Sequence, residues 1–247
     1  GLDHQEELRE YEDWEKRVHP EDLPAALAGL RACLDGTRPS LRIEYRVQRH
    51  DGEWRWVQVR AIVVRRDTHN KPLRMTGMIS DISEKRRSEE IAWHHANFDA
   101  LTGLPNRRLF RDRLDHEVRK AQRTGLPLAL LFIDLDRFKE ANDLLGHDIG
   151  DRVLTEAGQR ISGCVRRSDT VARLGGDEFT AILTELVDLV PVEQVAQKIN
   201  DALSAPFFVD DEMVYLSASI GITLYPDDAS KAEDLVRNAD QAMYVAK

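Results

Sequence analysis

The sequence feature that most constrains the fold is a short apolar run that ends in carboxylates. Residues 128–133 are almost uninterruptedly apolar, and they lead directly into Asp134-Leu135-Asp136. An apolar run of this length, without alternation, is typical of a strand that is buried on both faces. The sequence therefore predicts a buried strand whose end presents acidic side chains.

The acidic residues at this strand end have two physical interpretations. Asp134 and Asp136 can accept hydrogen bonds from the free N–H groups of a following helix, as capping residues do. They can also hold Mg²⁺, which is usually bound by one or two carboxylates together with the phosphates of a substrate. The Asp-x-Asp spacing alone favours neither interpretation.

A second group of chemically important residues lies at 173–179, inside a predicted hairpin. Gly175 and Gly176 suit a tight turn that requires positive φ angles at both central residues. A generic glycine pair would indicate only a turn with solvated acids. The adjacent Asp177 and Glu178, on a loop without obstructing side chains, favour instead a divalent-metal site for phosphoryl transfer, formed together with the acidic strand end.

The stretch 138–151 adds residues that suit a nucleotide. Lys139 lies one helical turn beyond the carboxylates, where its ammonium group can meet a phosphate. Asn142 supplies an amide and Asp151 an acceptor-only carboxylate. Because guanine presents adjacent N–H donors, an aspartate opposite them selects against adenine. Each of these residues taken singly is also a common helix cap.

The remaining patterns predict an α+β chain in two parts. The first part is a small sensor-like unit of one helix and three antiparallel strands, and helices alternate with strands in the second part. The predicted helices are 19–34, 84–96, 104–123, 137–145, 151–164, 191–203 and 232–247. The predicted strands are 41–47, 53–66, 73–82, 128–133, 170–174, 179–183 and 213–224. The helix at 84–96 is either a solvated connection or a dimerising signalling helix.

Composition and charge exclude several classes of function. The 247 residues suffice for one or two domains, and residues 91–247 hold almost all of the net charge of −9. This acidity argues against binding a nucleic-acid polymer, which needs a basic stripe. Cys33 and Cys164 lack the spacing of a zinc module.

The expected location is the cytoplasm, because a disulfide framework is improbable and no apolar run approaches the ~20 residues of a membrane helix. The chain opens on Gly1 rather than on Met. We therefore expect a fragment, and the full-length protein can carry a membrane anchor outside it.

In this order, these residues resemble the GGDEF-type diguanylate cyclase family over roughly residues 97–247. The resemblance implies a polymerase-palm-like, ferredoxin-like domain. It is carried by the motifs at 98–107, 134–139, 142–143, 146–147, 150–151, 175–179, 219–222 and 239–247.

The resemblance implies that this domain condenses two GTP into cyclic di-GMP and two pyrophosphates. Asp134 and Asp177 are then expected to bind Mg²⁺ (or Mn²⁺), helped by the backbone carbonyl of Leu135. Glu178 is expected either to assist at the metal site or to take the proton from the attacking 3′-hydroxyl. Asp177 and Glu178 are therefore the expected catalytic residues.

The resemblance also implies a set of substrate-binding residues. Asn142 and Asp151 are expected to read guanine, while the phosphates are held by Phe138, Lys139 and Lys247. The glycines of the hairpin complete the set, which is Phe138, Lys139, Asn142, Asp151, Gly175, Gly176 and Lys247. The family's arginine just beyond the last lysine, and its last strand, are expected to lie past the end of this chain.

The reaction implies a homodimer. Each domain holds one GTP, and each 3′-hydroxyl must attack the other GTP's α-phosphate, so two half-sites must face each other across a two-fold axis. Arg166 and Asp169 fall where the family places its product-inhibition site, and an arginine can contact guanine O6 and N7 bidentately. Cyclic di-GMP is therefore expected both as product and as inhibitor. Taken alone, these two residues indicate only a charged helix end.

Residues 19–88 resemble the C-terminal portion of a PAS sensor domain, through the motifs at 17–22, 49–57 and 77–83. The family's first two strands have no counterpart in this chain. The expected domains are a PAS-like sensor at 1–83, a connecting signalling helix at 84–97 and the GGDEF domain at 98–247.

The sequence thus predicts a cytoplasmic diguanylate cyclase under the control of a PAS sensor. The alternative is a GTP-binding GGDEF domain that regulates an EAL-type cyclic di-GMP phosphodiesterase beyond Lys247. A third class, a scaffold that uses its PAS part for dimerisation, would show no dependence on GTP.

Overall fold

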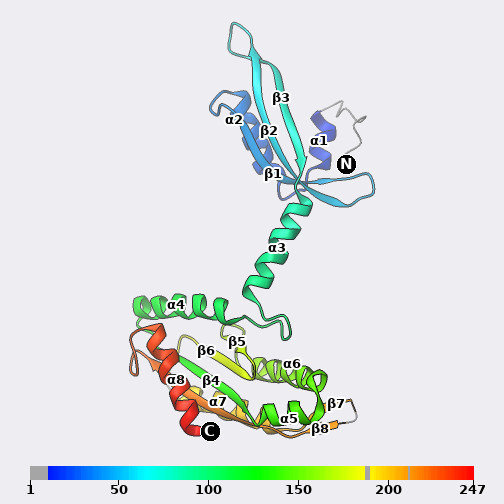
Figure 1. The fold of residues 1–247 in the computed structure, drawn as a ribbon. Helices are drawn as coiled ribbons and strands as arrows, with labels where there is room; N and C mark the ends of the chain where they lie inside the picture. Colours follow the sequence, from blue (N-terminus) through cyan, green and yellow to red (C-terminus); the bar gives the residue numbers. More distant parts are fainter. Residues whose placement is uncertain (1–10, 187–189, 211) are drawn as a thin grey trace. The chain divides into compact units, whose positions relative to one another are not determined.

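The computed structural model describes residues 11–186, 190–210 and 212–247. Residues 1–10 of the expected PAS-like region lie outside the described residues. The chain divides into two compact units, one ending at Ala92 and the other beginning at Trp93, and each is described by itself. Both contain helices and strands, which confirms the α+β class (Figure 1).

The first unit is a three-stranded antiparallel sheet with a helix packed on one face. The strands β1 (Leu41–Gln48), β2 (Trp54–Arg66) and β3 (Pro72–Asp81) lie in the order β1-β2-β3, and the three predicted strands are thereby confirmed. Helices α1 (Tyr11–Arg17) and α2 (Leu23–Leu34) precede them. The buried core of this unit is formed by Val18, Ala26, Cys33, Leu41, Tyr45, Val57 and Val59.

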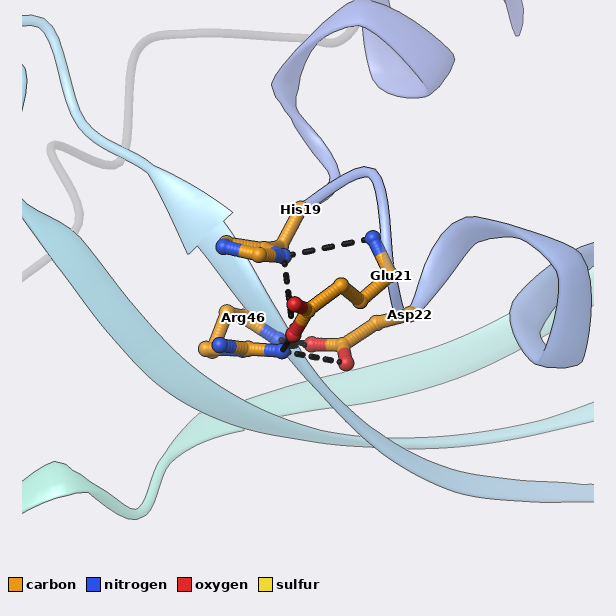
Figure 2. Close-up of polar contacts among 4 residues, drawn as sticks. All are labelled: His19, Glu21, Asp22 and Arg46. Carbon is orange, nitrogen blue, oxygen red and sulfur yellow. Dashed lines mark hydrogen bonds and ion pairs between the residues drawn. The ribbon is translucent and has the colours of Figure 1, made fainter.

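The predicted start of the first helix at residue 19 is wrong, because the acidic residues before α2 bind a strand arginine instead (Figure 2). The Asp22 carboxylate accepts hydrogen bonds from the backbone N–H, Nε and Nη2 of Arg46 at 2.8–2.9 Å. Arg46 also pairs with Glu21 at 2.8 Å. The hydrogen bonds from this guanidinium lower the pKa of Asp22 to about 2. The helix therefore begins only at Leu23, with Asp22 at the N-cap position.

Helix α3 (Ser83–Asn97) begins on the sheet of the first unit. The backbone N–H of Trp56 donates to Ser83 Oγ at 3.0 Å. Arg86 pairs with Glu44 at 2.6 Å, and its guanidinium lies over the Trp56 ring at 3.8 Å from the ring centroid. The first turn of α3 is thus held by a hydrogen bond, an ion pair and a cation–π contact.

The second unit is built around β4 (Leu128–Asp136). This strand lies between β6 (Glu178–Leu183) and β9 (Ser217–Tyr225), and β5 (Thr170–Gly175) pairs with the far side of β6. All neighbouring pairs in this four-stranded sheet are antiparallel. Every residue of β4 before Asp136 is buried, which confirms the predicted strand with two covered faces.

Helices cover both faces of this sheet (Figure 1). Helices α4 (Arg107–Thr124) and α8 (Ala232–Ala246) contribute to the core on one face, and α6 (His147–Cys164) and α7 (Val190–Ser204) to the core on the other. The short helix α5 (Phe138–Leu145) connects β4 to α6. The carboxyl end of β4 therefore leads straight into the two helices that carry the expected guanine-reading residues.

Three further predicted elements differ in the structure. Helix α4 begins at Arg107 rather than at residue 104, because the Asn106 side chain caps it. The single strand expected at 213–224 is divided, because β8 (Glu212–Val214) pairs with β7 (Phe207–Val209) in a separate hairpin and only β9 joins the central sheet. Helix α6 begins at His147 rather than at residue 151. Gly146, with a φ of 90°, ends α5 and allows the next helix to begin at once.

Candidate active site

The acidic strand end and the glycine hairpin meet at one edge of the central sheet. The strand register places Asp134 of β4 opposite Glu178 of β6, and directly opposed residues carry their side chains on the same face with Cβ atoms about 5 Å apart. The backbone N–H of Leu135 donates to the carbonyl of Asp177 at 3.4 Å. The carboxylates of Asp134, Asp177 and Glu178 are therefore brought into one site.

The hairpin turn lies one residue later than the sequence indicated. Gly175 pairs with Glu178 across the two strands, so the two turn residues are Gly176 and Asp177. Both glycines nevertheless have positive φ angles, 140° at Gly175 and 55° at Gly176. A Cβ at either position would meet no atom within 4 Å. The turn therefore leaves its backbone open to a close approach by a ligand.

Arg173 holds this turn in place. The sequence pattern assigned no role to this residue. Its Nε and Nη2 donate to the carbonyl of Gly176 at 3.0 and 2.8 Å, and its Nη1 donates to Asp99 Oδ1 at 2.9 Å. Asp99 also accepts hydrogen bonds from the N–H and hydroxyl of Thr102. Because the Arg173 side chain is only 10% exposed, this network fixes the position of the turn.

Arg107, which also had no expected role, reaches the same hairpin from α4. The Asn106 side chain caps this helix by accepting hydrogen bonds from two backbone N–H groups, and Arg107 is its first residue. From there Arg107 donates to the carbonyl of Leu174 and to Glu178 Oε2, both at 3.3 Å. Nothing in the local pattern around residue 107 indicates this contact, because its partners are about seventy residues away in the sequence.

The carboxylates are close enough to change one another's protonation. Burial raises the pKa of Asp177, and the charge of Asp134 raises it further. Burial also raises the pKa of Glu178, an effect that Arg107 partly offsets. Lys247 Nζ donates to Asp134 Oδ1 at 2.7 Å, and this hydrogen bond raises the pKa of Lys247. The site thus holds an excess of acceptor charge, which a hard divalent cation can neutralise.

The donor set fits a cation that keeps ligand positions for its substrate. In the part of the chain that the structure describes, no group of three or more His, Cys, Asp or Glu side chains is placed to hold a metal ion by itself. Mg²⁺ is commonly held by one or two carboxylates, while water and substrate phosphates supply the other oxygens. Asp134, Asp177 and the carbonyl of Leu135 match that chemistry.

The capping interpretation of the strand-end acids does not hold for α5. The residue at its N-cap position is Arg137, with a φ of 57° and no side-chain cap hydrogen bond. Asp136 instead accepts hydrogen bonds from the hydroxyls of Ser217 at 2.7 Å and Ser219 at 2.8 Å. Asp136 therefore ties the end of β4 to β9.

The start of α5 is arranged to meet an anion. Phe138 is its first residue, and the side chain of Phe138 is buried in the core. This residue can therefore reach a phosphate only through its backbone N–H. Lys139 is exposed, and no side chain caps the N–H groups at this helix start. Free N–H groups at a helix N-terminus are a common phosphate site.

The expected guanine-reading residues lie on neighbouring helices. Asn142 stands on α5, and Asp151 is exposed on α6. Asn142 Nδ2 lies 2.8 Å from His147 Nδ1. This contact gives His147, to which the sequence assigned no individual role, a place beside the expected base site.

The expected product site lies in the turn before β5. Asp169 accepts hydrogen bonds from the backbone N–H of Arg166 at 2.9 Å and from that of Thr184 at 3.2 Å. Its carboxylate therefore holds the turn itself. The Arg166 side chain is exposed, and no contact of its guanidinium is found among the described residues.

Comparison with known proteins identifies both parts of the chain. Residues 96–247 match the family described as "Diguanylate cyclase, GGDEF domain". The chain belongs to this family. Residues 1–79 match the PAS fold. Both resemblances noted in the sequence are thereby confirmed, and the GGDEF family's enzymes in general need divalent metal ions.

Three relatives illustrate the match. Diguanylate cyclase TpbB of Pseudomonas aeruginosa is 47% identical over 155 residues, 62% of this chain and 36% of that protein. Its isolated GGDEF domain covers 61% of this chain and 88% of the solved one, with 47% identity and a TM-score of 0.59. The bifunctional diguanylate cyclase/cyclic di-GMP phosphodiesterase MucR of the same organism is 46% identical over 149 residues, 60% of this chain and 22% of that protein.

The third relative was solved with a ligand. The coiled coil and GGDEF domain of DgcB from Caulobacter crescentus, in complex with c-di-GMP, is 26% identical, with a TM-score of 0.61. The match covers 67% of this chain and 87% of the DgcB chain. By contrast, this chain spans about a third or less of the length of TpbB and MucR.

Two further findings bear on the alternatives raised by the sequence. The hairpin signature from Gly175 to Phe179 is intact, so a purely regulatory GGDEF domain is not favoured. No helix in the described ranges is long and apolar enough to cross a membrane.

Proposed function

We propose that this chain is a diguanylate cyclase that condenses two GTP molecules into cyclic di-GMP. The observation that carries the proposal is the hairpin, which sets Asp177 of the turn and Glu178 of β6 beside Asp134. Burial there raises the pKa of both Asp177 and Glu178. In each of two equivalent steps, a 3′-hydroxyl oxygen bonds to the α-phosphorus of the other GTP. The α–β phosphoanhydride bond breaks, and pyrophosphate and one proton leave.

The chain's own groups divide this work. Asp134, Asp177 and the carbonyl of Leu135 are proposed to hold Mg²⁺, or Mn²⁺ in its place. When bound, the cation supplies charge that stabilises the reacting phosphates. Glu178 is proposed to accept the 3′-hydroxyl proton, because burial raises its pKa and so makes it a stronger base.

The substrate is proposed to lie along α5 and α6. The free N–H groups at Phe138 and the ammonium of Lys139 would hold phosphates, together with Lys247, which here contacts Asp134. Asn142 and Asp151 would contact guanine. Because an aspartate accepts from both N1–H and N2–H of guanine, whereas adenine offers no donor at N1, GTP is favoured over ATP.

The proposal is tested by incubating the chain with GTP and Mg²⁺ and separating the nucleotides. We expect cyclic di-GMP from GTP, none from ATP and none after chelation of the metal. Absence of product would contradict the proposal and favour a regulatory domain.

Catalysis is expected to depend on protein concentration. Each domain holds one GTP, so the two half-sites act only when two copies meet. The specific activity should rise as the protein is titrated through its monomer–dimer transition, while GTP binding per chain stays constant. Parallel measurements of activity and of mass by light scattering check this. A specific activity that stays constant across the monomer–dimer transition would contradict the homodimer.

Product inhibition is expected to require Arg166. This side chain is exposed, whereas Asp169 holds the local turn, so Arg166→Ala removes a ligand contact without disturbing the backbone. A bidentate arginine–guanine contact discriminates by about 1–3 kcal/mol, so the inhibition constant should rise by about 10-fold or more. Arg167→Ala, which changes the adjacent exposed arginine, is the control. Equal inhibition of the wild type and Arg166→Ala would count against the site.

The division of labour along the chain is part of the same proposal. Residues 1–83 would act as the PAS sensor, 84–97 as the signalling helix and 98–247 as the catalytic domain. Support comes from the contacts of Ser83 and Arg86 with Trp56, which attach the start of α3 to the first unit's sheet. An EAL domain beyond this chain is a further proposed partner. The name of the relative MucR gives a diguanylate cyclase and a cyclic di-GMP phosphodiesterase in one protein.

A further inference from the structure

The corner between α5 and α6 brings an amide and an imidazole together. Gly146 ends one helix and His147 begins the next, so Asn142 of α5 meets the first residue of α6. Asn142 Nδ2 lies 2.8 Å from His147 Nδ1. With Nδ2 on this side, the amide N–H donates to Nδ1 in the imidazole tautomer that carries its proton on Nε2.

The other end of the same amide lies against a glycine. A Cβ at Gly150 would overlap Asn142 Oδ1 and would lie 3.0 Å from Asn142 Cγ. It would also lie 3.3 Å from the Phe138 ring, so a methyl group at residue 150 would be crowded by two side chains. Gly150 is buried and does not have a left-handed φ, so its lack of a side chain serves the approach of Asn142.

The two contacts together restrict the rotation of the amide. A free asparagine side chain can rotate so that its oxygen and nitrogen exchange places, and the two orientations present opposite hydrogen-bonding groups to a base. In this structure His147 contacts Nδ2 and Gly150 faces Oδ1, so the His147 hydrogen bond favours one of the two orientations. Asp151, the residue after Gly150, is exposed on the same helix.

We infer that His147 is a positioning residue for guanine selection, which holds the Asn142 amide in the orientation that reads the base, and that Gly150 provides the space for it. This inference rests on the proposed function, because it takes the Asn142–Asp151 surface as the base site. His147 needs no contact with the nucleotide in this role. His147 acts through Asn142, so it is expected to affect the choice of base and not the reaction at the phosphates.

A pair of substitutions at His147 separates the hydrogen bond from the bulk of the ring. His147→Asn keeps an acceptor oxygen at the position of Nδ1, whereas His147→Leu keeps the size and removes the acceptor. The probe is a GTP analogue with a methylene bridge between the α- and β-phosphates, which binds without reacting, and the matching ATP analogue is the reference. Both dissociation constants are measured on the whole chain with Mg²⁺ present.

The expected result is a loss of affinity for the GTP analogue alone. His147→Leu should raise the dissociation constant of the GTP analogue by about 10-fold, the value of one well-placed hydrogen bond. The dissociation constant of the ATP analogue should stay within about 2-fold of its wild-type value. His147→Asn should restore binding to within about 3-fold of the wild type. In an Asn142→Ala background His147→Leu should have no further effect, because a residue that acts only through Asn142 has nothing left to position.

Gly150 provides an independent variant on the same helix. Gly150→Ala should displace the amide and lower the preference for the GTP analogue as far as His147→Leu does. Gly163→Ala is the matched control, because this α6 glycine has nothing within 4 Å of a new Cβ. The inference is overturned if His147→Leu and Gly150→Ala keep the wild-type preference for guanine, or if the His147 effect persists without Asn142.

These binding measurements also separate the inference from the function on which it rests. A chain that prefers the GTP analogue through His147 but forms no cyclic di-GMP contradicts the proposed cyclase and supports the inference. A chain that forms cyclic di-GMP and keeps its guanine preference in both variants contradicts the inference alone. A wild type that binds the two analogues equally contradicts both.

Discussion

Asp177→Asn is expected to lower cyclic di-GMP formation by about 10²–10³-fold, the usual cost of removing one group that stabilises developing charge. The fold should be kept, because the backbone carbonyl of Asp177 accepts the Leu135 N–H and the adjacent Gly176 supplies the left-handed turn residue. Asparagine has the same shape as aspartate and lacks the charge that a divalent cation needs. Initial rates at saturating GTP and Mg²⁺ measure the effect.

The control removes an acid elsewhere in the same unit. Asp112 is exposed on α4, and Asp112→Asn changes the net charge by the same amount. Its rate should stay within about 2-fold of the wild type, as for most surface changes. A rate for Asp177→Asn that matched the control would contradict the assignment of Asp177.

The same substitution has an expected effect on stability that needs no turnover. The pKa of Asp177 is raised in the folded state by burial and by Asp134. A carboxyl with a raised folded pKa favours folding below its unfolded value of about 4, and that contribution is lost as the pH rises through the folded pKa. At neutral pH in chelator, the ionised Asp177 therefore costs stability, and Asp177→Asn should melt at a higher temperature than the wild type.

Two dependences check this stability effect. The higher melting temperature of Asp177→Asn should fall to the wild-type value below about pH 4, where Asp177 itself is neutral in both folded and unfolded chains. Mg²⁺ should raise the melting temperature of the wild type more than that of the variant, because only the wild type has both carboxylates. Equal melting curves for the two proteins at every pH would mean that Asp177 is not crowded by Asp134.

Gly221→Ala is expected to destabilise the second unit by about 3 kcal/mol or more, the upper range for forcing extra atoms into a packed core. Gly221 lies in β9 under α8, and a Cβ there would overlap the backbone oxygen of Ala239 and the backbone nitrogen of Met243. Backbone atoms cannot rotate away, so the whole helix must move. Because α8 leads to Lys247, the contact between Lys247 and Asp134 should be lost with it.

Urea denaturation measures this effect, with far-UV circular dichroism as the signal. Gly163→Ala is again the control, since it adds the same methyl group to a helix where space is free. That variant should be as stable as the wild type or slightly more stable, because alanine favours a helix over glycine. If Gly221→Ala unfolded at the wild-type midpoint, the close packing of α8 on β9 would be wrong.

Features that depend on one segment of sequence were predicted well. The apolar run before Asp134 indicated a strand covered on both faces, and β4 has both faces covered. Helix α4 carries its signals at its ends, where the Asn106 side chain accepts two backbone N–H groups and Gly125 takes a left-handed φ of 74°. Local hydrogen bonding and backbone freedom depend directly on residue type, so the sequence pattern predicts these elements.

Features that depend on partners far apart in the sequence could not be predicted from pattern. The bonds of Arg173 to Asp99, and of Asp136 to Ser217 and Ser219, join segments whose proximity exists only after the sheet has formed. The shift of the hairpin turn by one residue has the same origin, because the irregular pairing between Arg173 and Gly175 is set by the facing strand β6. Residue types suggested a metal and nucleotide site, and the fold supplied its supporting contacts.

The fate of the phosphorus atoms of GTP distinguishes a cyclase from a protein that only binds or hydrolyses GTP. Phosphorus NMR of GTP incubated with the chain and Mg²⁺ follows every phosphate at once. We expect a phosphodiester signal from cyclic di-GMP together with two pyrophosphates for each molecule of it, and no accumulation of GDP. Release of inorganic phosphate with GDP, or GTP that persists unchanged while bound, would contradict the proposal that this acidic site is a diguanylate cyclase.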